Sequence, residues 1–83
     1  MTKQMNTVSY PAQFVADEEA GGYVVTFRDI PEAITQGDTL EEAKEMAAFA
    51  LTIAFEYYRE DVKQIPEPSI TQEGDVLITV KLP

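Results

Sequence analysis

Two residue types that carry much of protein chemistry are missing from this 83-residue chain, which contains no cysteine and no histidine. Without cysteine there is no disulfide framework and no thiolate nucleophile. Without histidine the chain lacks the commonest general base and the commonest metal ligand. Only six residues are basic, against fifteen acidic ones, and the six are scattered. Because a nucleic-acid backbone is bound by clustered Lys and Arg, we expect no direct nucleic-acid binding by this chain.

Long apolar runs are also missing. No stretch reaches membrane-spanning length, and residues 1–6 lack the apolar segment of a secretory leader. We therefore expect a cytoplasmic protein with no membrane association. A chain of this length makes one domain, spanning residues 1–83, with a core that provides only modest stability. The net charge of −9 has two interpretations, a solvated acidic surface or complementarity to a basic partner such as a nucleic-acid-binding protein.

The clearest structural signal is a helix start followed by a long uninterrupted stretch. Thr39 is a good N-cap residue, and Glu42 three positions later completes a capping box. No Pro or Gly follows before Pro66, so we predict a helix over residues 40–58 or 40–60. Its buried stripe is predicted to contain mainly alanine, with these members: Leu40, Ala43, Ala47, Ala50, Leu51, Ala54 and Tyr58.

A second apolar group lies on one flank of the predicted helix. Its members are Met46, Phe49, Ile53 and Tyr57. A single helix on a four-stranded sheet does not need so wide an apolar arc. Two interpretations follow, either additional core under the edge of the sheet or contact with another subunit or partner.

Alternating apolar and polar side chains predict a strand at residues 7–16. Further strands are predicted at residues 23–27, at residues 33–37 as a short strand, and at residues 76–80, which are rich in β-branched side chains. Gly21 and Gly22 provide the turn of a hairpin between the first two strands. Pro11 cannot donate a backbone hydrogen bond, so its position is predicted to be an edge or non-bonded site. The order β-β-β-α-β predicts an α+β domain. A three-stranded antiparallel meander and one further strand would carry one long helix packed on one face.

The acidic residues form no recognisable catalytic or metal site. They fall in predicted turns or on the helix surface, and their spacing does not match a calcium-binding loop. Gly21 and Gly22 precede a strand rather than a helix, which argues against a phosphate-binding loop. The serines have no histidine to activate them. We therefore expect no catalytic residues, no metal, no cofactor and no enzymatic activity.

Several short segments together resemble the HicB antitoxin family. They are Tyr10-Pro-Ala, Glu19-Ala-Gly-Gly-Tyr-Val-Val-Thr-Phe, Asp29-Ile-Pro-Glu-Ala, Thr35-Gln-Gly-Asp-Thr-Leu-Glu-Glu-Ala and Ile65-Pro-Glu-Pro-Ser. The resemblance implies a degenerate ribonuclease H-like domain of the same β-β-β-α-β order. It also implies an antitoxin of a type II toxin–antitoxin system. Such an antitoxin binds and neutralises a HicA-type toxin, a small basic ribonuclease that cleaves mRNA with a histidine.

The sequence also departs from that family. Members usually carry a C-terminal DNA-binding domain, whereas this sequence ends at Lys81-Leu82-Pro83. Either the chain is shortened or it is a naturally short member, so operator binding is not transferred to these residues. Arg28 stands where many members have proline. The first predicted strand lacks the carboxylates that a ribonuclease H site needs, which leaves residual nuclease activity as the weakest hypothesis.

Partner contacts are predicted at two places, a bend after the second strand and the apolar flank of the helix. The predicted contact residues are Arg28, Asp29 and Glu32 in the bend, and Glu45, Phe49 and Glu56 on the helix. Acidic and aromatic surface would cover the RNA-binding face and the histidine of the toxin. The alternative is ordinary surface on a stand-alone, oligomeric interaction or ligand-sensing domain without a toxin. Small size and the wide apolar arc also predict a homodimer or tetramer.

Overall fold

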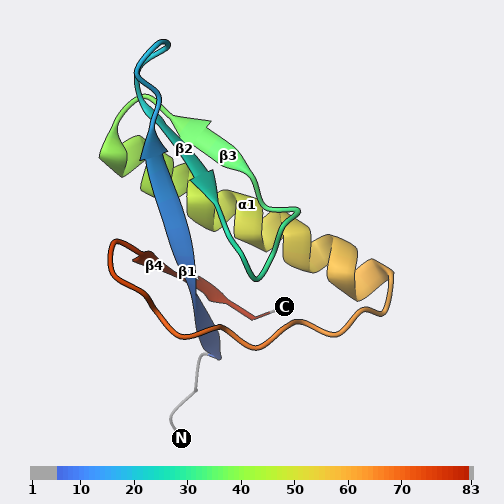
Figure 1. Cartoon of the computed structure of the whole chain (residues 1–83). Helices are drawn as coiled ribbons and strands as arrows, with labels where there is room; N and C mark the ends of the chain where they lie inside the picture. Colours follow the sequence, from blue (N-terminus) through green and yellow to red (C-terminus); the bar gives the residue numbers. More distant parts are fainter. Residues whose placement is uncertain (1–5, 83) are drawn as a thin grey trace, which may run out of the picture.

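The computed structural model describes residues 6–82, which form four strands and one helix (Figure 1). The elements are β1 Thr7–Ala16, β2 Tyr23–Thr26, β3 Thr35–Gly37, α1 Leu40–Glu60 and β4 Val76–Lys81. The strands form one antiparallel sheet in the order β3-β2-β1-β4, with α1 across one face. The predicted arrangement, a meander plus one strand and one helix, is confirmed. Residues 1–5, part of the stretch that we searched for a leader, lie outside the described residues.

The strand β1 is central in the sheet, but each part of it pairs with a different neighbour. Residues 13–16 pair with β2, and residues 7–12 pair with β4. Pro11 therefore lies where β1 pairs with β4 alone, opposite Leu77. This placement agrees with the edge-like position predicted from its missing N–H.

The segment between β2 and β3 makes both strands shorter than predicted. The strand β2 ends at Thr26, β3 begins at Thr35, and a bend at Ile30-Pro31 separates the two strands. The side chains of Ile30 and Ala33 are buried in the core, and the Ala33 N–H donates to the Ile30 carbonyl at 2.9 Å. Pro31 stops strand pairing at this point, so the bend contributes to the core instead of the sheet.

The start of α1 is held by a capping box and by a close approach to β3. The Thr39 hydroxyl accepts from the Glu42 N–H at 3.0 Å, and the Glu42 carboxylate accepts from the Asp38 N–H at 2.6 Å. The backbone at Gly37 passes so close that a Cβ there would lie 2.5 Å from the Ala43 nitrogen. The absence of a side chain at residue 37 lets the first turn of the helix rest directly on β3.

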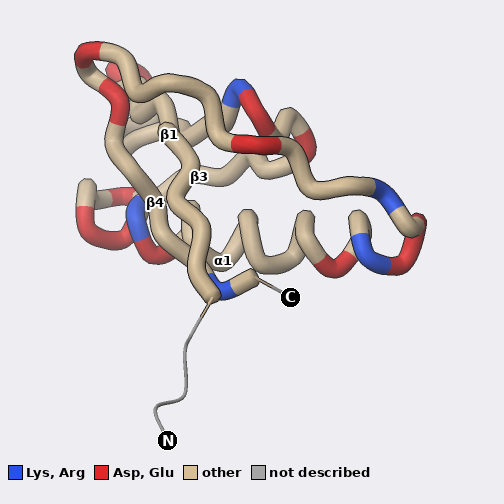
Figure 2. The backbone as a smooth tube through the Cα atoms, turned by 90° about the horizontal axis from the view of Figure 1, so that it is seen from below, with Lys and Arg blue, Asp and Glu red and all other residues tan. Residues whose placement is uncertain are grey.

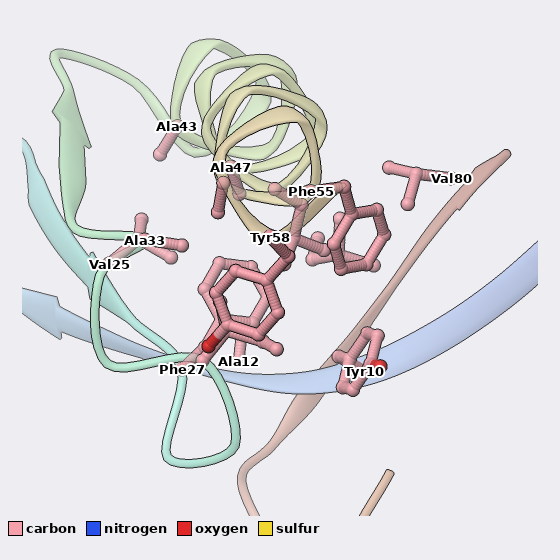
Figure 3. Packing of buried hydrophobic residues seen from close by; sticks show 14 residues of the cluster. Tyr10, Ala12, Val25, Phe27, Ala33, Ala43, Ala47, Phe55, Tyr58 and Val80 are labelled. Carbon is pink, nitrogen blue, oxygen red and sulfur yellow. The ribbon is translucent and has the colours of Figure 1, made fainter. Parts of the chain in front are cut away.

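The core lies between α1 and the sheet (Figure 3). The buried helix residues are Ala43, Ala47, Leu51, Ala54, Phe55 and Tyr58. The alanine-rich stripe is thus largely confirmed, although Leu40 is 42% exposed, at the first helical position, and Ala50 is only half-buried. Phe55 was not predicted. Its ring packs against Tyr10, with centroids 5.8 Å apart, and fills the space between α1 and the β1–β4 pair.

Within the described residues 6–82, α1 is not apolar enough over its length to cross a membrane.

Two phenylalanines on α1 provide a matched test of this packing. Phe55 is 1% exposed, whereas Phe49 is 60% exposed. We expect Phe55→Ala to lower the free energy of unfolding by about 3–5 kcal/mol, because it removes a buried ring and leaves a cavity. Phe49→Ala should change it by less than about 0.5 kcal/mol. Urea denaturation of both variants measures the difference, and equal losses would contradict the assignment of the buried face.

Candidate protein-binding surface

The bend after β2 fastens the loop that connects α1 to β4. Arg28 forms an ion pair with Asp75, and its guanidinium also donates to the Ser69 hydroxyl at 3.0 Å and the Ile70 carbonyl at 3.2 Å. The Asp29 carboxylate accepts from both the N–H and the hydroxyl of Ser69, each at 3.0 Å. Arg28 and Asp29 are therefore both joined to the loop.

The same loop is held from the core side by Tyr10, whose hydroxyl donates to the Pro66 carbonyl. The segment Ile65-Pro-Glu-Pro-Ser, noted in the sequence, thus lies between the Tyr10 hydroxyl and the Asp29 carboxylate. Burial, followed by the charges of Asp29 and Glu67, raises the pKa of Tyr10 and keeps its hydroxyl protonated to donate. These contacts give the motif a structural explanation.

In the ion pair between Arg28 and Asp75, the carboxylate of Asp75 is more deeply buried than the guanidinium of Arg28. The Asp75 side chain is 6% exposed and that of Arg28 is 30% exposed. The hydrogen bond from Arg28, followed by those from Gln72 and Gln13, lowers the pKa of Asp75 to about 2. The charges of this pair compensate each other within the molecule.

Glu32, the third predicted contact residue in the bend, also has intramolecular partners. Its carboxylate accepts from the Tyr58 hydroxyl at 2.8 Å and lies 3.5 Å from the Lys63 ammonium. The hydrogen bond from Tyr58 is the main cause of its lowered pKa. Burial, followed by this hydrogen bond, raises the pKa of Tyr58 to about 12. All three bend residues thus take part in interactions that hold the fold, and their contact with a partner stays a prediction.

The helix flank presents a different surface. Met46, Phe49, Ile53 and Tyr57, which we call the α1 ridge, are 38%, 60%, 40% and 63% exposed. Their spacing of three and four residues places them along one side of the helix, away from the buried alanine stripe. The interpretation of this flank as additional core is therefore wrong, because the sheet already covers the opposite side of α1. Contact with a subunit or partner is the interpretation that remains.

A shallow hollow of about 200 Å³ adjoins the α1 ridge where the helix meets the bend. Its lining residues are Glu32, Ile34, Ala50, Ile53, Ala54 and Tyr57. Ile34 is 64% exposed and extends the apolar surface beyond the helix. The sequence placed Ile34 in a strand, and no periodic signal there showed that it would face outward beside Tyr57.

Acidic residues border the α1 ridge. Residues 46–55 contain no charged side chain, and Figure 2 shows Asp and Glu at both ends of α1, with Lys or Arg among them, and at the hairpin tip. Glu45 and Glu56 are both exposed, as predicted contacts should be. They are eleven residues apart, so at roughly 100° per residue they lie on nearly the same side of the helix. Phe49 lies between them along the axis.

The described residues 6–82 contain no group of three or more Asp or Glu placed to hold a metal ion. Every buried side-chain oxygen or nitrogen in this part of the chain has a hydrogen-bond partner. The α1 ridge itself combines exposed apolar side chains with exposed glutamates beside it.

Comparison with known proteins identifies the family. The model of the HicB_like antitoxin of bacterial toxin-antitoxin systems matches residues 9–83. This chain belongs to the HicB-like antitoxin family. It is 56% identical over 64 residues to "Antitoxin HicB 1" of Photorhabdus laumondii, covering 77% of this chain and 41% of that protein. It is 49% identical over 73 residues to "Antitoxin HicB" of Escherichia coli, covering 88% of this chain and 52% of that protein.

The family match confirms the resemblance found in the sequence, and membership of an antitoxin family agrees with the expectation that the chain is not an enzyme. A second Photorhabdus laumondii protein, "Antitoxin HicB 2", is 46% identical over 82 residues. That alignment covers 99% of this chain and 55% of the relative. The chain thus spans about half the length of the curated relatives it matches.

The ion pair between Arg28 and Asp75 should make stability depend on acid pH. The pKa of Asp75 is about 2 in the folded chain against an ordinary value of 3.8, so the unfolded chain takes up the proton first as pH falls. The stability contributed by Asp75 is present above about pH 4 and is lost towards pH 2. We expect the free energy of unfolding to fall less steeply over this range for Asp75→Asn than for the wild type. Parallel curves in urea denaturation at each pH would contradict the role of this pair.

Proposed function

We propose that this chain is the toxin-binding part of an antitoxin and that it neutralises a HicA-type mRNA-cleaving toxin in the cytoplasm. The match of the HicB_like antitoxin family over residues 9–83 is the observation that carries this proposal. The antitoxin names of relatives at 46–56% identity support it. The partner would be a small basic ribonuclease, and the complex would block access of RNA to its active site.

Electrostatics supports the same pairing. A chain with a net charge of −9 attracts a basic protein and speeds their association, particularly at low ionic strength. In such a complex, the acidic side chains would also repel RNA phosphates that approach the toxin. Inhibition would therefore combine steric cover with repulsion of the substrate, and it needs no catalytic group in the antitoxin.

A second function is favoured by one specific observation, the exposed α1 ridge. Apolar side chains in such a row also suit self-association, which would make the chain an oligomeric HicB-like interaction or ligand-sensing domain without a toxin. A neighbouring gene for a basic protein of about 60 residues with a histidine would favour the antitoxin. Its absence, together with a stable homodimer or tetramer in light scattering, would favour the second function.

Co-expression provides the direct test of the antitoxin proposal. Induction of the neighbouring basic protein alone should arrest growth, and co-induction of this chain should restore it. The two proteins should elute as one complex in size-exclusion chromatography. As a matched control, Phe55→Ala should rescue poorly because the core is weakened, whereas Leu77→Ala, on the exposed sheet face, should rescue like the wild type. Arrest that persists with the wild-type chain, and no complex on the column, would reject the proposal.

A further inference from the structure

We propose that the α1 ridge, with Glu45 and Glu56 beside it, is the surface that binds the basic toxin. This inference rests on the proposed function and names the part of the molecule that performs it. The geometry makes the outer side of α1 the binding element and assigns the bend around Arg28 to the fold. The partner should offer an apolar surface flanked by cationic side chains.

The bend is a poor binding surface because its charged groups already have partners. Arg28 joins Asp75, Ser69 and Ile70, and Asp29 accepts two hydrogen bonds from Ser69. A toxin that bound these groups would first have to break interactions that hold the loop to the sheet. The side chains of the α1 ridge have no such role in the fold.

The α1 ridge has three features that are typical of the centre of a protein–protein interface. Phe49 and Tyr57 are large, exposed aromatic side chains, a type enriched in protein–protein interfaces. The hollow beside Ile34 and Tyr57 can receive an apolar side chain of a partner. The ridge is built on a 21-residue helix that a capping box and a packed core hold in place, so it is rigid before binding.

Charge repulsion disfavours an antiparallel pairing of two copies of this chain through their ridges. If two ridges packed antiparallel about a two-fold axis near Ala50, Glu45 of one helix would lie opposite Glu56 of the other. Lys44 projects to nearly the opposite side of the helix from the ridge. The ion pairs of the described residues 6–82 join Arg28 to Asp75 and Lys63 to Glu32, so neither Lys44 nor Arg59 neutralises Glu45 or Glu56 within the chain. Like charges across an interface disfavour it, and a basic partner removes the conflict.

The spacing of the two glutamates describes the complementary surface. Glu45 and Glu56 are eleven residues apart, which corresponds to roughly 16 Å along the helix axis. The toxin should therefore present two Lys or Arg side chains about this far apart. An apolar surface between these two cations would cover Phe49 and Ile53. If those cations also bind RNA phosphates, the antitoxin competes directly with the substrate.

Titration calorimetry tests the assignment with the full 83-residue chain and the neighbouring HicA-type toxin, inactivated by replacing its histidine with alanine. We expect Phe49→Ala to weaken binding at least tenfold. Glu45→Lys and Glu56→Lys should each weaken it about tenfold at low salt and less at high salt. Matched controls lie elsewhere: Leu77→Ala removes an exposed apolar side chain from the opposite sheet face, and Glu18→Lys reverses an exposed charge at the hairpin tip. Both controls should bind like the wild type, and thermal melting confirms that each variant folds.

The outcomes separate this inference from the proposed function. If the wild type binds the toxin and Phe49→Ala, Glu45→Lys and Glu56→Lys bind it equally well, the ridge assignment is overturned and the antitoxin function stands. Loss of binding in Leu77→Ala alone would move the site to the open sheet face and also overturn it. A wild-type dimer that Phe49→Ala dissociates without loss of toxin affinity would assign the ridge to a second copy. No binding by the wild type would reject the antitoxin function itself.

Discussion

The helix α1 carries two apolar faces, and the four-stranded sheet can bury only one of them. The inner face of small residues lies on the sheet and holds the core together through Leu51 and Phe55. The outer face, the α1 ridge, keeps Phe49 and Tyr57 in solvent, where their exposure costs free energy unless a partner covers them. The fold of this small domain thus determines which residues are available for binding.

Close approach of the helix to the sheet is what makes this division possible. Gly37 has no side chain to hold β3 away from Ala43, and the alanines that follow keep the helix axis near the strands. Arg28 and Asp29 fasten the loop that returns the chain to β4. The α1 ridge therefore stands on a fold in which Arg28 and Asp29 already have partners in the loop between α1 and β4.

Local sequence patterns were sufficient for the element order, the capping box and the bounds of β1 and α1. They were not sufficient for contacts between distant segments. The partners of Arg28 lie more than forty residues away, so the sequence could not show that Arg28 links two segments of the fold. Helical periodicity identified both apolar faces of α1, yet it missed Phe55, which faces β4 rather than the centre of the stripe. The predicted contacts Glu45, Phe49 and Glu56 are exposed together, whereas Ile34 carried no signal of its own.

Chemical-shift mapping tests most directly whether α1 binds the toxin through the α1 ridge while its inner face packs on the sheet. Backbone amide spectra of the isotope-labelled chain would be recorded with and without the inactivated toxin. We expect shifts concentrated at residues 45–57 and at Glu32 and Ile34, which line the hollow beside Tyr57, with Arg28, Asp29 and the exposed face of β4 unchanged. Shifts confined to Arg28 and Asp29 or to that sheet face, with residues 45–57 unaffected, would contradict this assignment.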